Sequence, residues 1–346
     1  MKAAVFRGPS QLAVEEIPYP RLPADGLILK VEACGVCGSD LRTFQHGLRI
    51  RRDSQVLGHE IAGVVAEVGG AVTDYEVGER LAVAADVHCG NCFYCRLALY
   101  NLCENWQVIG THYPGGFAEY MPLEEAILRR GIVHRTPSGL SGPAAALAEP
   151  ASSVLASQHN VGVEAGETVV ILGAGPIGCL HVEVARARGA KTVVVELLAE
   201  RLAVAEGLGP ERALRADNSD VVAEVRGFTG GRGADVVIVA APSKAAQAQA
   251  IELVRKRGRV VFFGGLPAAD PLAPLNSNLI HYNELTVMGA FSYHPRFHEL
   301  ALDLIARGKI RADKIITALF PLGQIVEAFE AARSGSQVKV MITPNS

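Results

Sequence analysis

A short glycine-rich turn constrains the fold of this chain more than any other feature of the sequence. The apolar, β-branched run 169–172 leads directly into residues 173–178, Gly-Ala-Gly-Pro-Ile-Gly. In a G-x-G-x-x-G turn the first glycine makes the tight turn, the second lets the backbone meet a pyrophosphate, and the third brings helix and strand together. The phosphates then lie at the N-terminus of the following helix. The motif therefore predicts a strand–turn–helix unit that binds a dinucleotide.

The surrounding sequence extends this unit into a parallel sheet. Apolar strand segments at 169–172, 192–196, 235–239 and 259–263 alternate with helical segments at 177–188, 199–208 and 243–256. Such alternation indicates βαβ units. Glu196 ends the second strand, where a carboxylate can accept hydrogen bonds from both ribose hydroxyls of NAD and repel the 2′-phosphate of NADP. Arg201 follows one helical turn later, placed either to cover the adenine or to be solvated.

The N-terminal half has a different texture. Short strands are predicted at 3–6, 12–17, 27–34, 61–68 and 80–84, separated by Pro and Gly, which favours an all-β, barrel-like domain. A helix is predicted from 143 to about 159, bent near Pro150. Helices at 295–307 and 322–333 and a strand at 338–342 are expected to return to this first domain.

Two segments of the N-terminal half carry metal-ligand chemistry. Cys37 begins a Cys-Gly-Ser-Asp run, and His59 and Glu60 follow Gly58. Zinc takes S, N and O ligands, and a catalytic zinc keeps one position open. Asp40 is placed to accept the second imidazole N–H of His59 and so fix its tautomer.

A second metal site is predicted from four cysteines. Cys89, Cys92, Cys95 and Cys103 have the spacing C-x2-C-x2-C-x7-C. Four thiolates close a tetrahedral zinc shell, so this site is expected to be structural. The other two cysteines outside the metal motifs, Cys34 and Cys179, fall on a predicted strand and helix and are interpreted as core residues.

Composition excludes several classes of function. The 346 residues carry a net charge of −3 and are 49% hydrophobic, which suits a large globular core rather than a nucleic-acid or membrane surface. No apolar run reaches the length of a membrane span, and the N-terminus lacks a secretory apolar region. A cytoplasmic protein is expected, because four of the seven cysteines cluster as they do in metal sites of reducing compartments.

Taken together, these motifs resemble the zinc-dependent medium-chain dehydrogenases. That family shares the order Cys-Gly-Ser-Asp, Gly-His-Glu, four-cysteine lobe and Gly-x-Gly-Pro-x-Gly, and the run 115–120, Gly-Gly-Phe-Ala-Glu-Tyr, is also similar. Gly-His-Glu together with Glu149-Pro150 resembles the sorbitol (polyol) and threonine dehydrogenase branch. The resemblance implies an α/β protein with a GroES-like β-barrel catalytic domain and a Rossmann cofactor domain, a doubly wound parallel sheet.

The domains expected from the resemblance are a GroES-like domain at 1–153 with the structural zinc lobe at about 86–105, a Rossmann NAD-binding domain at 154–290, and a C-terminal return at 291–346. The resemblance implies one catalytic zinc held by Cys37 and His59 with the carboxylates of Glu60 and Glu149, and one structural zinc. It leaves open which carboxylate binds zinc directly. Ser39 is implied as the first member of a proton relay, which Arg42 cannot continue because it does not release its proton.

The resemblance also implies a cofactor site and an oligomer. The implied NAD contacts are Gly173, Gly175, Pro176, Ile177, Gly178, Glu196, Arg201, Phe263, Gly264, Gly265, Ala290, Phe291 and Ser292. A homodimer or homotetramer is expected, paired through the edge strand at 285–289.

The predicted activity is hydride transfer from a secondary alcohol to NAD, giving a ketone, with a polyol, sugar alcohol or related sugar derivative as substrate. L-threonine 3-dehydrogenase is the alternative within the class. A zinc-free quinone or enoyl reductase and a non-catalytic NAD-binding protein are alternatives from other classes, and the zinc motifs argue against both. Residues that bind polyol hydroxyls in sorbitol dehydrogenases are replaced here by Thr43 and Ser292.

Four arginines lead into the Gly-His-Glu motif: Arg42, Arg49, Arg51 and Arg52. They are consistent with a solvated basic loop. The sharper hypothesis is that they recognise an anionic group on the substrate, because arginine forks suit phosphate or carboxylate.

Overall fold

The computed structural model describes residues 1–47 and 52–345, so Arg49 and Arg51 lie outside the described residues. The chain forms two compact units. Unit 1 comprises Met1–Ser152, Tyr293–Gly308 and Ile316–Ser346, and unit 2 comprises Ser153–Ser292 and Lys309–Ile315. The expected C-terminal return at 291–346 is thus interrupted by a short segment that belongs to unit 2. Among the described residues, no helix is long and apolar enough to cross a membrane.

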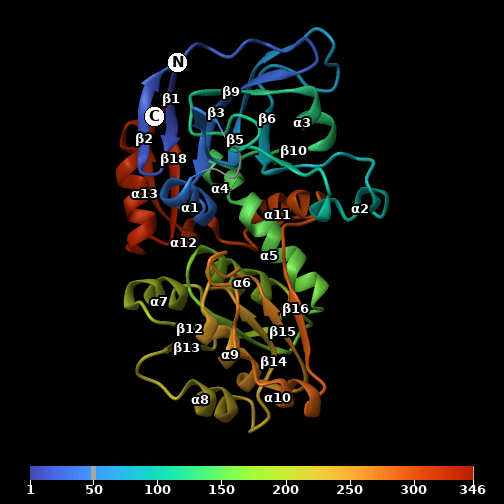
Figure 1. The fold of residues 1–346 in the computed structure, drawn as a ribbon, viewed down its shortest axis with the longest axis vertical. Coiled ribbons are helices and arrows are strands. Elements are labelled where there is room, and N and C mark those ends of the chain that lie inside the picture. Colours follow the sequence, from blue (N-terminus) through green and yellow to red (C-terminus); the bar gives the residue numbers. More distant parts are fainter. Residues whose placement is uncertain (48–51, 346) are drawn as a thin grey trace. The chain divides into compact units, whose positions relative to one another are not determined.

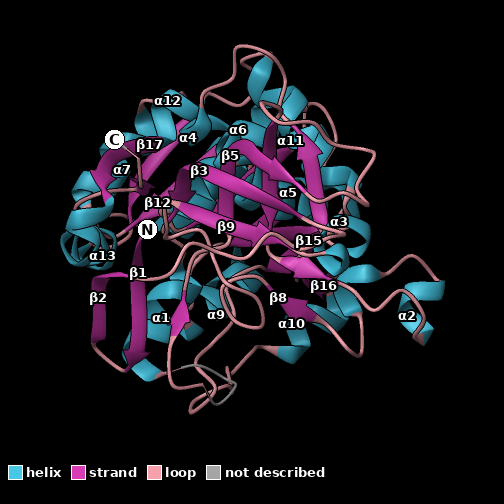
Figure 2. Cartoon of the chain, turned by 90° about the horizontal axis from the view of Figure 1, so that it is seen from above, coloured by secondary structure: helices cyan, strands magenta, loops and turns pink. Residues whose placement is uncertain are grey.

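Unit 1 is built on a small antiparallel sheet and a larger sheet in which all strand pairs are antiparallel except the C-terminal pair of β17 and β18 (Figures 1 and 2). The smaller sheet has the order β2-β1-β4 and contains β1 (Lys2–Gly8), β2 (Gln11–Glu16) and β4 (Gln55–Val56). The larger sheet has the order β10-β6-β5-β3-β18-β17, and β9 also pairs with β3. Its strands are β3 (Leu27–Gly35), β5 (Glu60–Val68), β6 (Arg80–Ala84), β9 (Tyr120–Leu123), β10 (Ile132–Arg135), β17 (Ile316–Pro321) and β18 (Lys339–Thr343).

The inner faces of these strands form one apolar core. Leu29, Ile61 and Val83 lie on three neighbouring strands and are completely buried. Phe329 of helix α13 (Ile325–Ser334) lies in the same core. Its ring packs edge to face against that of Phe117, with the ring centroids 5.7 Å apart. The C-terminal strand β18 pairs with β3, so the end of the chain completes the barrel-like unit.

Unit 1 also contains shorter strands and several helices, which carry residues of the candidate metal sites. They are α1 (Gly38–His46), β7 (Asp86–Val87), α2 (Phe93–Arg96), η1 (Tyr100–Leu102), β8 (Gln107–Val108), α3 (Glu125–Arg130), α4 (Gly142–Ala146), α11 (Arg296–Ala306) and η2 (Leu322–Gln324). Helix α5 (Ala148–Asn160) begins in unit 1 and ends in unit 2.

Unit 2 is a six-stranded, all-parallel sheet with the order β13-β12-β11-β14-β15-β16 (Figure 1). The strands are β11 (Thr168–Leu172), β12 (Lys191–Glu196), β13 (Arg212–Arg215), β14 (Ala234–Val239), β15 (Val254–Phe262) and β16 (Thr286–Gly289). The helices are α6 (Pro176–Ala187), α7 (Ala199–Glu206), α8 (Val221–Phe228), α9 (Lys244–Leu253), α10 (Ser277–Tyr282) and α12 (Ala312–Ile315). This 3-2-1-4-5-6 order is that of the doubly wound dinucleotide-binding fold. The predicted α/β fold class is confirmed.

The structure corrects two boundaries. The predicted helix at 143–159 breaks at Leu147, not near Pro150. Pro150 lies in the first turn of α5, where its missing N–H is not needed. The predicted helix at 243–256 ends at Leu253, because Val254 already pairs with Ala234 in the sheet. Tertiary pairing here overrides the local helical preference.

The short segment Lys309–Ile315 is fixed to unit 2 by charge. Arg311 donates to both carboxylate oxygens of Glu183, a completely buried residue of α6, and to the carbonyl of Leu208. Arg186 also pairs with Glu183 and donates to the carbonyl of Lys309. The two arginines neutralise the buried carboxylate, and these contacts lower its pKa although burial raises it.

Candidate metal and cofactor sites

Cys37 is held at the start of helix α1. It occupies the N-cap position, and its backbone N–H donates to Oδ2 of Asp40 at 3.0 Å. Asp40 is 4% exposed, and its other oxygen, Oδ1, accepts the N–H of Gly58 at 3.3 Å. One buried carboxylate therefore joins the Cys-Gly-Ser-Asp run to the Gly-His-Glu run.

The same carboxylate orients His59. Its Nδ1 lies 3.5 Å from Oδ1 of Asp40, and its Nε2 lies 3.3 Å from the hydroxyl of Ser39. With Nδ1–H directed at Asp40, the Nε2 lone pair is available to a metal. Burial lowers the pKa of His59, but the charges of Asp40 and Cys37 outweigh burial and raise it well above the ordinary value.

Gly58 is required for this arrangement. Its φ is +92°, and a Cβ at this position would lie 2.6 Å from Sγ of Cys34. Any side chain would therefore displace the buried Cys34 and Phe117.

Cys37, His59 and Glu60 converge. Each offers one ligand atom, and these atoms all lie within 4.8 Å of one another. A soft thiolate, an imidazole and a carboxylate in this arrangement fit a zinc ion. Glu149 is not in this three-residue group, so among the described residues the structure places Glu60, rather than Glu149, with the cysteine and histidine.

Lys339 is a member of this site that sequence reasoning missed. It is 1% exposed, forms an ion pair with the carboxylate of Glu60, and donates to the carbonyl of Val36 at 3.0 Å. Burial lowers the pKa of Lys339, but Glu60 and Cys37 outweigh it and raise the pKa. The sequence does contain a signal for this role, because Lys339 is a charged residue inside the otherwise apolar run 338–342.

Glu149 lies in the first turn of α5 and accepts a hydrogen bond from the hydroxyl of Tyr293 at 2.9 Å. Burial, together with the nearby carboxylates of Glu60 and Asp86, raises the pKa of Glu149 to about 7, although His59 opposes the shift. Burial, followed by the carboxylates of Glu149 and Asp86, raises the pKa of Tyr293 well above its ordinary value.

The four predicted zinc cysteines form a second cluster. Their sulfur atoms all lie within 4.8 Å of one another, and none is in a disulfide. The Sγ atoms of Cys89 and Cys95 are 4.0 Å apart, and those of Cys92 and Cys103 are 3.9 Å apart. Backbone N–H groups, with that of Asn91 first, lower the pKa of Cys89 to about 6. The antiparallel pair of β7 and β8 closes the base of this lobe. Four converging thiols fit a closed, structural zinc site.

In unit 2 the glycine-rich turn has the predicted geometry. Gly173 has φ +106°, and a Cβ on Gly178 would lie 1.9 Å from the carbonyl oxygen of Gly173. Gly175 is the N-cap of α6 and Pro176 its first residue. The turn therefore leaves the N-terminus of α6 open to an anionic ligand.

Glu196 bonds to this turn. Oε2 accepts the N–H of Ala174 at 2.6 Å, and Oε1 accepts those of Leu197 and Leu198 at 2.7 and 2.9 Å. The expected acceptor of both ribose hydroxyls is thus already engaged by backbone on both oxygens. The guanidinium of Arg201 lies near the turn, with Nη1 3.9 Å from the position of a Cβ on Gly175.

The remaining predicted cofactor residues follow the carboxyl ends of β15 and β16. The N–H groups of Phe263 and Gly264 donate to the carbonyl of Val239, and that of Ala290 donates to Phe262. Phe291 is 56% exposed, and Ser292 adopts φ +49°. Because the sheet is parallel, these segments share one edge with the glycine-rich turn, where ligands of such sheets bind.

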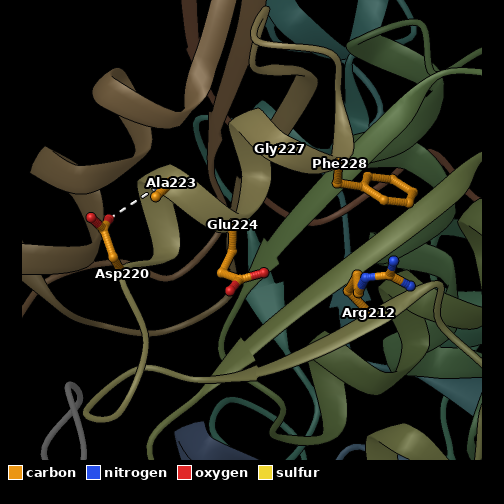
Figure 3. A pocket seen from close by; sticks show the side chains of 6 residues that line it. All are labelled: Arg212, Asp220, Ala223, Glu224, Gly227 and Phe228. Atoms are coloured by element: carbon orange, nitrogen blue, oxygen red, sulfur yellow. Dashed lines mark hydrogen bonds between the residues drawn. The ribbon is translucent and has the colours of Figure 1, made fainter.

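A surface pocket of unit 2 carries none of the predicted site residues (Figure 3). It lies between β13 and α8. Arg212 stacks over the ring of Phe228 at 5.4 Å, and Asp220 caps α8 by accepting the N–H of Ala223 at 3.0 Å. These polar groups stabilise local structure.

Comparisons with known proteins agree with this geometry. Residues 23–134 match the alcohol dehydrogenase GroES-like domain, and residues 176–307 match the zinc-binding dehydrogenase family. The chain is 33% identical to sorbitol dehydrogenase of Bacillus subtilis, over 100% of this chain and 98% of that protein. It is also 33% identical to D-arabitol-phosphate dehydrogenase of Enterococcus avium, over 98% and 95% of the two chains.

A solved structure is similar over the whole chain. A zinc-binding dehydrogenase from Sinorhizobium meliloti, bound to NADP, aligns with a TM-score of 0.92 and 33% identity, over 99% of both chains. The chain therefore belongs to the zinc-dependent medium-chain dehydrogenases, in their sorbitol dehydrogenase branch, as the resemblance predicted. It is an oxidoreductase that acts on a small-molecule alcohol.

Proposed function

We propose that this protein oxidises a secondary alcohol of a polyol or sugar derivative to a ketone, with NAD as hydride acceptor. The observation that carries the proposal is the convergence of Cys37, His59 and Glu60 on one point, with Asp40 fixing the imidazole. In this proposal unit 1 is the catalytic domain and unit 2 is the NAD domain.

The residues of the chain have distinct roles in this proposal. Cys37, His59 and Glu60 hold the catalytic zinc, with Glu149 as the further carboxylate. Bound zinc supplies Lewis-acid chemistry that lowers the pKa of an alcohol hydroxyl, and the nicotinamide supplies the hydride acceptor. Ser39 is half-buried beside His59 and takes the hydroxyl proton first. Arg42 is exposed and keeps its own proton, so it does not continue the relay beyond Ser39.

The four-cysteine lobe holds the structural zinc. The turn at 173–178 binds the pyrophosphate, Glu196 and Arg201 bind the adenosine half, and the segments at 263–265 and 290–292 bind the nicotinamide half. The charge of Glu196 supports NAD over NADP. The enzyme is cytoplasmic, and copies pair as a dimer or tetramer through β16, whose outer edge has no strand partner among the described residues.

Two observations support the hypothesis that the substrate carries an anionic group: the position of one arginine and the activity named for one relative. The guanidinium of Arg52 is anchored by donating to the carbonyl of His112 at 2.7 Å, which leaves further N–H groups for a ligand. One 33% identical relative is a D-arabitol-phosphate dehydrogenase.

The test is NADH production by the purified enzyme on a panel of polyols, sugar phosphates, sugar acids, inositols and threonine. The proposal predicts turnover of a polyol or sugar derivative. Turnover of threonine alone would instead assign an amino-alcohol dehydrogenase. Reduction of a quinone or enoyl substrate without zinc, or no turnover of any compound, would contradict the proposal.

A further inference from the structure

The ring of Tyr100 contacts two imidazoles in unit 1. Its centroid is 4.2 Å from that of His88, with 34° between the ring planes, and 5.1 Å from that of His294, with 42° between the planes. All three side chains are half-buried. The three rings therefore form a continuous chain of tilted ring contacts, the ring stack.

One end of the stack belongs to the four-cysteine lobe. Tyr100 lies in η1, between Cys95 and Cys103, and it packs against the cysteine cluster. His88 directly precedes Cys89. The position of the Tyr100 ring thus depends on the closure of the lobe around its four sulfur atoms.

The other end of the stack leads to Glu149, the further carboxylate of the proposed catalytic site. His294 follows Tyr293, whose hydroxyl donates to Glu149 at 2.9 Å. The backbone N–H of Arg296 donates to Nδ1 of His294 at 3.1 Å, so the histidine is also anchored to the start of α11. Tyr293 is 3% exposed, so its side chain has little room to reorient unless His294 moves with it.

We propose that Tyr100 is a positioning residue for alcohol oxidation, which couples the closed four-cysteine lobe to Glu149 through His294 and Tyr293. The inference rests on the proposed roles of Glu149 at the catalytic zinc and of the lobe at the structural zinc. Packed side chains transmit displacement because they have few alternative arrangements. Groups that orient a metal's carboxylate strengthen metal binding, and losing one costs about 10–100-fold in affinity or activity.

The test measures the release of catalytic zinc from the full-length holoenzyme during dialysis against dipicolinate. Zinc per chain is followed over time, and a Cys37→Ala protein, which holds only the lobe zinc, marks the end point. We expect about tenfold faster release from Tyr293→Phe and a several-fold increase from Tyr100→Leu. The double variant should release zinc no faster than Tyr293→Phe alone, because both changes break one chain of contacts.

Tyr94→Leu is the matched control. Tyr94 also packs against the cysteines, but its ring partner is Phe93, at 5.3 Å, instead of His294. It should leave the release of catalytic zinc unchanged. If Tyr100→Leu fails to fold, His294→Gln breaks the same stack from the other end and should behave as expected for Tyr100→Leu.

If the wild-type enzyme has its normal zinc content, two results would overturn this inference and leave the proposed function intact. One is that the effects of Tyr100→Leu and Tyr293→Phe multiply in the double variant. The other is that Tyr94→Leu speeds release as much as Tyr100→Leu does. A wild-type protein with zinc in the lobe but none at Cys37 would overturn the proposed function and this inference with it.

Discussion

Lys339 and Glu60 form an ion pair in which each residue is 1% exposed. Removing one partner of a buried pair leaves an uncompensated charge, which costs about 3–5 kcal/mol. Lys339→Met should therefore lower the free energy of unfolding of unit 1 by about this amount, measured in zinc-free protein by denaturant titration.

The double variant Lys339→Met/Glu60→Gln is the control for this prediction. It removes both charges and should recover most of the lost stability. Equal destabilisation in the single and double variants would show that Lys339 acts through packing instead of charge.

The buried histidine His181 should make unit 2 sensitive to acid. It is completely buried in α6, and burial lowers its pKa to about 3. The unfolded chain takes up this proton near the ordinary pKa of 6.5, whereas the folded chain does so only near 3. The contribution of neutral His181 to the free energy of unfolding is therefore present above pH 6.5. It decreases as the pH drops, by about 2 kcal/mol from pH 6.5 to 5.

This prediction is checked by measuring the free energy of unfolding against pH and comparing the slopes of the wild type and the variants. His181→Leu should flatten the slope in this window, even though it also removes the hydrogen bond between Gln158 and Nδ1 of His181. The hydrogen bond from Gln158 to the backbone carbonyl of residue 181 does not depend on the side chain. Replacement of the exposed His46 by Gln is the control and should leave the slope unchanged. An unaltered slope in His181→Leu would mean that other groups cause the acid sensitivity.

Glu196 should control both the choice of cofactor and the shape of the glycine-rich turn. The wild type should prefer NAD over NADP by at least tenfold in kcat/KM, about 1.4 kcal/mol, through ribose hydrogen bonds and charge repulsion. Because Glu196 also accepts the N–H of Ala174, Glu196→Ala should raise KM for both cofactors as well as reduce the preference. Steady-state kinetics with both cofactors check this, and equal kcat/KM values for the wild type would refute it.

Arg52 should act on charged substrates only. Arg52→Ala, and Arg49→Ala in the undescribed segment, should raise KM several-fold for a substrate with a phosphate or carboxylate, and added salt should weaken the effect. An uncharged polyol is the internal control, with unchanged KM. If an uncharged polyol turns over well and neither variant alters the kinetics of any substrate, these arginines belong to solvated surface.

Local motifs made much of this architecture predictable. The glycines at 173–178 and the four cysteines act through spacing within one short segment, so their geometry follows from the sequence. The grouping of Cys37 with His59 was predictable because each has a recognisable ligand motif. Lys339 was not, because only the pairing of β18 with β3 brings it to Glu60. The stack of Tyr100 on His294 likewise joins segments that no local pattern connects.

The most direct test of the central claim is zinc content measured together with turnover. The account predicts about two zinc ions per chain, with Cys37→Ala and His59→Ala folded, retaining one zinc and producing no NADH. Cys92→Ala should instead destabilise the lobe or the oligomer, because a closed thiolate site contributes to folding. A wild-type protein without zinc, or a Cys37→Ala variant with full activity, would contradict the account.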